Sequence, residues 1–393
     1  MSTKGPSVRV SVILFFLTVS VSFQFPMPAF GQSMTTTPGT LQLPSSVQSF
    51  FGGVPTGDAT AEPITVPVLD AIRRALDYNL GVLTAEDNLG RAQGARWRAL
   101  SDQLPNVSAR VSETRQKLNL AAFGFGTFAN TGANFPSFPN IVGPFNVFDA
   151  RVNLSQAIFD LHAINNTRAE NHNVDAARLM RRSARDLVIH VTGNVYIQAL
   201  AAEARAESAR AQRDTAQALY NTSLDLKSSG IVAGIDVLRS QVQLSTETQR
   251  VTSASNDAEK AKLQLARIIG LPLGQALRLD ARLPELPEPI VTLEQAVEQA
   301  YRLRPDYQAA LERVRAAEAA RQAIVGEALP SVRVNADYGE IGLTAASAQG
   351  TYTVVGALNI PIFQGGRLRG RLLEADADIR SRRAQAEDTK ASI

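Results

Sequence analysis

The chain has 393 residues, of which 20% are charged, and its formal net charge is only +3. Such a balanced charge excludes the strongly basic surface that nucleic-acid binding needs. Because the sequence contains no cysteine, it cannot form a disulfide, use a thiolate nucleophile or bind zinc through cysteine.

Residues 1–31 have the pattern of a signal peptide for export. Lys4 and Arg9 precede an apolar run, and Ala29 and Gly31 supply the small residues of a cleavage site. The apolar run is too short for a comfortable transmembrane helix, so an uncleaved anchor is the less favoured alternative. Either way, we expect the protein to be exported.

The rest of the chain is organised as an internal repeat. Residues 66–108 align without a gap to residues 291–333, and both copies are helical by period and alanine content. Both helical patterns stop at Leu-Pro, where proline cannot continue a helix. We therefore expect a flexible N-terminal segment at 32–65, a first structural repeat at 66–290 and a second, incomplete repeat at 291–393.

Four segments that follow the Leu-Pro pairs alternate between apolar and polar residues, as strands with one apolar face do. They lie at 107–113, 148–158, 332–338 and 352–362. Their polar faces include Arg110, Arg151, Asn153, Arg333, Asn335 and Asp337. Such strands form either a soluble sheet with one solvated face or a membrane barrel with lipid outside and water inside. The export signal favours the barrel, in which these polar residues would line the lumen.

Residues 160–270 are predicted to form a long helical hairpin. A heptad stripe runs through its second half, at Val237, Leu244, Val251, Ala258 and Leu265. The abundance of alanine favours close packing of two helices in a coiled coil. An arm of about 65 residues would be about 100 Å long, at 1.5 Å per residue.

The only strong break in this pattern is "SGIVAGIDVL" at residues 229–238, the predicted tip of the hairpin. It contains Gly230 and Gly234 as hinges and the aliphatic residues Ile231, Val232, Ile235, Val237 and Leu238. An exposed aliphatic bend is a liability unless another protein surface covers it. Asp236 is expected to cap a helix that starts near Val237.

The succession of helix, Leu-Pro, strand, loop, strand and long hairpin, repeated in tandem after a signal peptide, resembles the TolC-like outer membrane efflux family, the outer membrane factors. One motif is the pair of helix–strand junctions, at Leu104-Pro105 and Leu329-Pro330. Another is "LNIPIFQGGRLRGRL" at 358–372, with Pro361, Phe363, Gly365 and Gly366. The third is residues 228–244, similar to the family's periplasmic turn. The resemblance suggests that Asp236 also makes a polar contact between helices that keeps this end of the channel closed.

The resemblance implies a mainly α fold with β. Long α-helical coiled-coil hairpins would form an α-barrel across the periplasm, and four antiparallel strands per subunit would build a trimeric twelve-stranded transmembrane β-barrel. It also implies the outer membrane of a Gram-negative bacterium and a passive exit duct for small molecules or proteins, in a tripartite efflux or type I secretion system. A periplasmic adaptor (membrane fusion) protein would dock on the tip and connect the homotrimer to an inner-membrane pump.

The second copy departs from this pattern. The sequence ends at Ile393, soon after Phe363, so most of the second hairpin is expected to be missing and the chain to be truncated at its C-terminus. The alternatives are an exported, non-channel coiled-coil scaffold or adhesion protein, and a non-functional fragment of an efflux protein.

We see no catalytic constellation in the sequence. His162, His172 and His190 are scattered along one helical arm, without metal-ligand spacing or a paired nucleophile. We therefore expect no enzymatic activity, no catalytic, metal-binding or cofactor-binding residue, and no nucleic-acid partner.

Overall fold

The computed structural model describes residues 49–123, 139–281 and 292–393. The predicted signal peptide at 1–31 lies outside these residues. The described part of the predicted N-terminal segment contains a short 3-10 helix, Ser49–Phe51, and strand β1, Ile64–Val66. In the described parts of the chain, none of the helices combines the length and the apolar character that crossing a bilayer requires.

The internal repeat has equivalent helices in both copies. Helices α2, Val68–Tyr78, and α6, Leu293–Leu303, each have 11 residues. Helices α3, Leu80–Ser101, and α7, Pro305–Gly326, each have 22 residues. One helix was expected at the start of each copy, whereas the structure has two.

The two breaks have different physical causes. In the first copy, Asn79 adopts an extended backbone and its side chain accepts a hydrogen bond from the Gly81 amide (2.8 Å), which caps α3. In the second copy, Pro305 stands at the first position of α7, a favoured place for proline. Proline also pushes the preceding residue, Arg304, out of the helical conformation.

The four predicted strands form one antiparallel sheet in the order β2-β3-β5-β6. Their bounds are Asn106–Asn119 for β2, Ile141–Phe159 for β3, Ser331–Gly342 for β5 and Gln349–Asn359 for β6. Three strands are longer than predicted. The fourth was predicted to reach residue 362 but ends at Asn359, because Pro361 has no amide hydrogen to continue the ladder.

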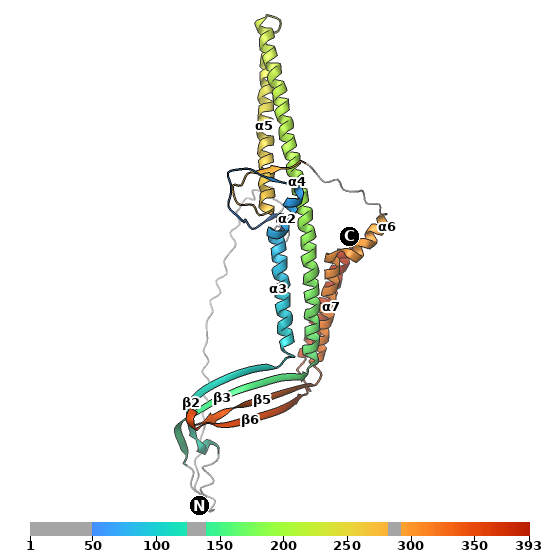
Figure 1. The fold of residues 1–393 in the computed structure, drawn as a ribbon. Helices are drawn as coiled ribbons and strands as arrows, with labels where there is room; N and C mark the ends of the chain where they lie inside the picture. The colour runs from blue at the N-terminus through green and yellow to red at the C-terminus, as the bar shows by residue number, and fades with distance from the viewer. Residues whose placement is uncertain (1–48, 124–138, 282–291) are drawn as a thin grey trace, which may run out of the picture. The chain divides into compact units, whose positions relative to one another are not determined.

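Each strand of this sheet is joined to one helix, which either precedes or follows it in the chain. Helix α3 leads into β2, β3 into α4 (Leu161–Ser228), α7 into β5, and β6 through a short turn into α8 (Arg367–Ala391). The helices pack in the order α3-α4-α7-α8, which is the order of the strands to which they connect (Figure 1). The chain therefore forms a single layer that changes from helices to strands at one level.

The long hairpin consists of α4, with 68 residues, and α5 (Gly234–Ile268), with 35 residues. At 1.5 Å per residue, α4 is about 100 Å long, as predicted for one arm. The second arm is only half as long, because Gly270 adopts a positive φ of 65° and Pro272 follows it. The remaining half of α4 packs against α3 and α7 instead.

Small side chains form the seam of this hairpin. The α4 side of the seam includes Ala199, Ala202, Ala206, Ala209 and Ala216, all buried. On α5, Val237, Ala258 and Leu265 of the predicted heptad stripe are buried, and Leu244 and Val251 are half-buried. The coiled-coil prediction is confirmed, and the alanines let the two backbones approach closely.

The hydrophobic core lies where α5 ends. Strand β1 pairs in parallel with β4, Leu277–Leu279, and packs with α2 and the middle of α4. Tyr196 of α4 is fully buried there and donates a hydrogen bond to the Val66 carbonyl (2.9 Å) while accepting one from the Asp280 amide (3.1 Å). Burial raises the pKa of the Tyr196 phenol.

Candidate functional site

One face of the sheet is polar and the other is apolar. The register places Arg110 opposite Arg151 and Asn153 opposite Asp337. Side chains of directly paired residues point to the same side of a sheet. The six residues predicted to line a lumen therefore lie on one face, to which Ser155 and Asn335 add a hydrogen bond of 2.8 Å.

Arg151 is the centre of an ion-pair cluster on this face. Its Nε lies 2.7 Å from Asp149 Oδ1 and its Nη1 lies 2.6 Å from Asp337 Oδ1. A Cβ added at Gly339, directly opposite, would come within 2.6 Å of Arg151 Cγ. The absence of a side chain at Gly339 therefore lets Arg151 lie across β5 and reach both carboxylates.

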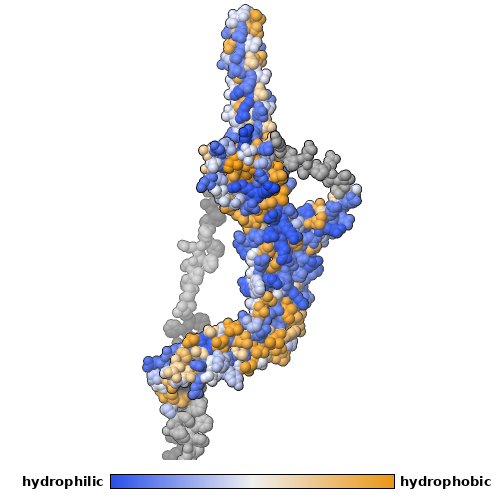
Figure 2. Space-filling view, viewed as in Figure 1, coloured by the Kyte–Doolittle hydropathy of each residue, from blue (hydrophilic) through white to orange (hydrophobic). Residues whose placement is uncertain are grey.

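The opposite face carries the apolar partners of the alternating pattern. They include Val107, Val111, Val152, Val354 and Leu358, all largely exposed in the single chain. Tyr338 and Tyr352 are paired directly across β5 and β6 on this face. On the visible side of the molecule, hydrophobic residues gather over the sheet and its junction with the helices, while the helices are mainly hydrophilic (Figure 2).

The first helix–strand junction is held by side-chain hydrogen bonds to α4. The Leu104 amide donates to the carbonyl of Ser101 (3.3 Å), and Pro105 then ends the turn before β2 begins. The Gln103 side chain donates a hydrogen bond to the hydroxyl of Thr167. The junction is thus tied to the first turns of the helix that follows β3.

The second junction relies on close backbone approach. The Leu329 amide donates to the carbonyl of Gly326 (3.0 Å), and Pro330 precedes β5. A Cβ added at Gly326 would lie 2.7 Å from the backbone nitrogen of His162 in α4. His162 also lies 3.2 Å from the Glu327 carboxylate.

The turn from β6 into α8 depends on two glycines. Gly365 and Gly366 have φ values of 57° and 82°, a region that residues with a Cβ rarely adopt. Gly366 is the N-cap of α8, so this pair makes the bend from strand to helix. Pro361 is half-buried and Phe363 is exposed beside the sheet.

Helix α4 ends at the predicted tip in a Schellman motif. The Gly230 amide donates to the Lys227 carbonyl and the Ile231 amide to the Leu226 carbonyl, both at 2.9 Å. Gly230 has a φ of 73°, as the motif requires. Gly234 has no positive φ, and an added Cβ there would only touch the Lys227 side chain at 3.8 Å. Only Gly230 is therefore needed as a hinge.

The aliphatic residues of the tip are not all at the surface. Ile231, Ile235 and Leu238 are 69%, 54% and 56% exposed, whereas Val232 is half-buried. Val237 is only 6% exposed, because it packs in the seam between α4 and α5. The exposed apolar surface of the tip therefore consists of Ile231, Ile235 and Leu238.

Asp236 does not cap a helix that starts near Val237, so this prediction was wrong. Helix α5 starts three residues earlier, at Gly234, with Ala233 as its N-cap and no side-chain hydrogen bond there. Asp236 lies in the first turn and its Oδ1 is 3.1 Å from Arg239 Nη1. A carboxylate in the first turn is favoured by the helix dipole.

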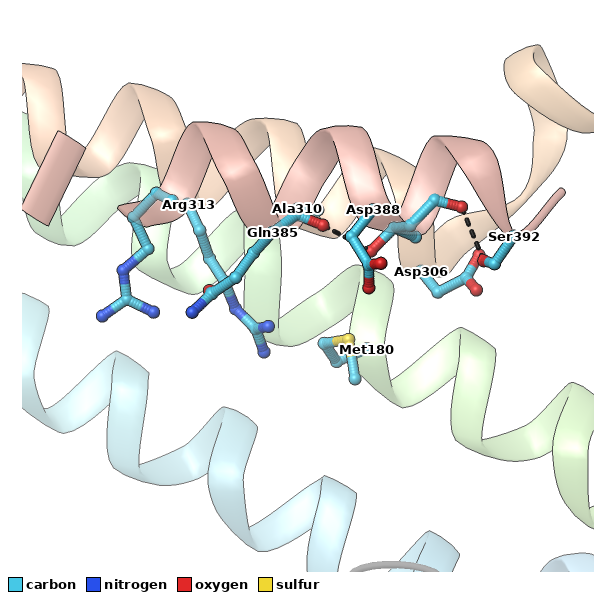
Figure 3. A pocket seen from close by; sticks show the side chains of 9 residues that line it. Met180, Asp306, Ala310, Arg313, Gln385, Asp388 and Ser392 are labelled. Atoms are coloured by element: carbon cyan, nitrogen blue, oxygen red, sulfur yellow. Dashed lines mark hydrogen bonds between the residues drawn. The ribbon is translucent and has the colours of Figure 1, made fainter. Parts of the chain in front are cut away.

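A polar cavity of about 290 Å³ lies between α4, α7 and α8 (Figure 3). Arg313 projects into this cavity. Its pKa is lowered mainly by partial burial and, to a smaller extent, by the positive charge of Arg382. The lining pairs no nucleophile with a base. Among the described residues, no three His, Asp or Glu side chains are close enough to hold a metal ion.

The arrangement has a clear counterpart among known families. A family model described as "Outer membrane efflux protein" matches residues 71–271, about half of the chain. The chain belongs to the outer membrane efflux protein family. This family consists of channel proteins rather than enzymes, and the resemblance seen in the sequence is confirmed.

Solved structures with this fold are outer membrane channels. The efflux protein is similar to the Campylobacter jejuni CmeC channel, with 16% identity and a TM-score of 0.71, over 92% of this chain and 76% of CmeC. It is also similar to Vibrio cholerae VceC, with 19% identity and a TM-score of 0.68, over 83% of this chain and 75% of VceC. No match was found among the curated proteins. The predicted TolC-like fold is thus confirmed.

Two residues that matter for the polar face were missed as site residues. Asp149 shares a face with Arg151 two positions away, a spacing visible in the alternating pattern. Gly339 carried no such signal, because its importance depends on the register between β3 and β5.

Proposed function

We propose that this efflux protein is one subunit of a homotrimeric exit duct in the outer membrane. Each subunit would contribute four strands to a shared twelve-stranded barrel, with the polar face inward and the apolar face toward lipid. The helices would continue the duct into the periplasm. Solutes would pass without a reaction or a cofactor, driven by an inner-membrane pump.

The observation that carries this proposal is the four-stranded sheet with one apolar face and two unpaired edges. Among the described residues, strands β2 and β6 each pair with a neighbouring strand on one side only. In a bilayer, unpaired backbone groups cost several kcal/mol each. Pairing β2 of one copy with β6 of the next closes the barrel, and the equal order of strands and helices brings α8 beside α3 of the neighbouring copy.

The proposal is tested with the full chain, purified in detergent. We expect a trimer by mass photometry, a migration on gels that shifts upon heating, and stepwise ion conductance in planar bilayers. A chain that stays monomeric and conducts no ions would contradict the duct and favour the coiled-coil scaffold or the non-functional fragment.

We also propose that the tip of the α4–α5 hairpin docks a periplasmic adaptor protein. The docking surface comprises Gly230, Ile231, Val232, Gly234, Asp236 and Leu238, together with Ile235. Its support is the exposed apolar side chains of Ile231, Ile235 and Leu238, at the end of a hairpin whose surface is otherwise mainly polar. Val237, predicted as a docking residue, is part of the seam and would support this surface from below.

The sharpest test compares two exposed aliphatic residues of the same hairpin. Ile231→Asp lies at the tip, and Leu263→Asp lies far from it, with similar exposures of 69% and 64%. We expect the first to abolish efflux of a toxic compound by cells that carry the cognate pump and adaptor, and the second to leave efflux intact. Immunoblots of outer-membrane fractions should show equal amounts of both variants. Equal efflux by the two variants would contradict docking at the tip.

A further inference from the structure

We propose that the barrel favours anionic solutes, through two arginines of the polar face that have no acidic partner, Arg110 and Arg333. This inference rests on the proposed exit duct and names the class of solute that its membrane part conducts best. It follows from the distribution of charges over the two faces of the sheet.

Arginines outnumber acidic residues on the polar face of the sheet. The register places Arg110, Arg151 and Arg333 there, with Asp149 and Asp337 as the acidic side chains. Both carboxylates are within 2.7 Å of the same guanidinium group, that of Arg151. Within the described strands, Arg110 and Arg333 make no ion pair, and both are exposed.

The other charged residues of the strands do not compensate for this excess. Glu113, Arg115 and Glu340 lie on the apolar face instead. Their register partners there are Phe148, Asn146 and Ala150, respectively. Lys117 lies at the register shift near the end of β2 and is itself positive. The polar face of one chain thus carries one positive charge more than negative ones.

In a closed barrel, the adjoining strand of the next subunit supplies no acid to this face. Arg110 belongs to the edge strand β2, whose partner in a closed barrel is β6 of the next copy, and residues 349–359 of β6 contain no charged residue. Arg333 lies in an inner strand, between Ala157 and Ala357. The segments 118–148 and 341–366, which connect and follow the strands, also contain no charged residue.

The size of the barrel makes these charges effective. Twelve strands spaced about 4.8 Å apart and tilted by about 40° give a backbone radius of about 12 Å. Arginine side chains that extend into this lumen bring every passing ion within about one Debye length, about 8 Å at physiological ionic strength. Low-dielectric walls lined with one sign of charge raise the local concentration of counter-ions.

The test measures the reversal potential of the purified full-length channel in planar bilayers under a gradient of potassium chloride. We expect a chloride-to-potassium permeability ratio above 1. The double variant R110Q/R333Q should lower this ratio by about twofold or more, with a smaller difference at high salt because salt screens exposed charges.

The matched control is R115Q, which removes the same charge from the same strand but from its apolar face. We expect its permeability ratio to equal that of the unmodified channel, and the heat-dependent gel shift should show that both variants assemble. A conducting channel with a ratio below 1, or with an equal ratio in the double variant, would overturn the anion preference alone. A trimer that conducts no ions would overturn the proposed duct and the preference with it.

Discussion

Helices α2 and α6 occupy equivalent positions in the two copies of the repeat, yet only one of them is buried. Ala71 and Ala75 of α2 are completely buried against α4 and the small β1–β4 sheet. Helix α6 has the same length and a similar amphipathic pattern but no buried residue. The comparison teaches that the period of a sequence determines a helix and its apolar face, while the partner determines whether that face is covered.

The largest expected effect comes from placing a charge on each helix at the same repeat position. Ala75→Glu would bury a carboxylate among the apolar side chains of α4 and should destabilise the chain by about 3–5 kcal/mol. Ala300→Glu, at the equivalent position of α6, should change the stability by about 0.5 kcal/mol or less. Thermal unfolding of the full chain in detergent, followed by far-ultraviolet circular dichroism, measures both. Equal losses of stability in the two variants would contradict the view that burial of α2, and not of α6, decides the cost.

At the two helix breaks, we also expect a substitution in the first copy to cost more stability than the equivalent substitution in the second copy. The Asn79 amide donates to the carbonyls of Phe50 (2.9 Å) and Ile268 (3.5 Å) while its oxygen caps α3. Asn79→Ala leaves these buried groups unpaired and should cost about 2–3 kcal/mol. Arg304→Ala, the equivalent change in the second copy, removes a surface ion pair that contributes about 1 kcal/mol or less. Urea denaturation of both variants measures these losses. A larger loss of stability in Arg304→Ala than in Asn79→Ala would contradict the prediction.

At the helix–strand junctions, the second copy should be the more sensitive one. Gly326→Ala would push a Cβ into the backbone of α4 at His162 and should destabilise the chain by about 1–3 kcal/mol. Ser101, the equivalent residue, already carries a Cβ, and Ser101→Ala should cost about 1 kcal/mol or less. The melting temperatures of the two variants provide the measurement. A Gly326→Ala variant as stable as Ser101→Ala would show that α4 can move away at no cost.

The smallest expected effect is a dependence of stability on pH that arises from Asp306 in the second copy. Hydrogen bonds from Arg304 (2.6 Å) and from the Tyr307 amide (2.9 Å) lower the pKa of Asp306. Its contribution to stability is therefore complete above the unfolded pKa of about 3.9 and is lost as the pH falls through the lower folded value. The first copy has Gly81 at this position.

We expect Asp306→Asn to reduce stability by about 1 kcal/mol or less at neutral pH. The difference from the unmodified chain should vanish near pH 2, when the carboxylate is protonated in both states. Melting temperatures recorded at the two pH values test this. A difference that persists at low pH would show that the asparagine acts through packing rather than through charge.

Much of the fold could be predicted from local patterns. The alternation of apolar and polar residues located all four strands, and Leu104-Pro105 and Leu329-Pro330 located both junctions, because a proline cannot continue a helix. The break at Arg304 could also have been predicted from Pro305. The break at Asn79 could not, since the carbonyls that hold its side chain belong to residues far away in the sequence.

The candidate site was predictable only in part. Alternation placed Arg110, Arg151 and Asp337 on one face. The register of β3 and β5 decides that Asp337 pairs with Arg151, which leaves Arg110 without an acidic partner. At the tip, the heptad stripe indicated that Val237 faces the seam, but the composition of the tip alone did not separate it from the exposed Ile231. The distinction arises from the direction in which α5 faces α4.

Local sequence patterns encode the repeat, the periods of the helices and strands, and the places where one changes into the other. These properties depend on neighbouring residues, through backbone sterics and the spacing of apolar side chains. The folded chain reveals which apolar faces are covered, where α5 ends relative to α4, and which charges on the polar face neutralise one another. Those outcomes depend on distances between segments that are remote in the chain, and no local pattern encodes them.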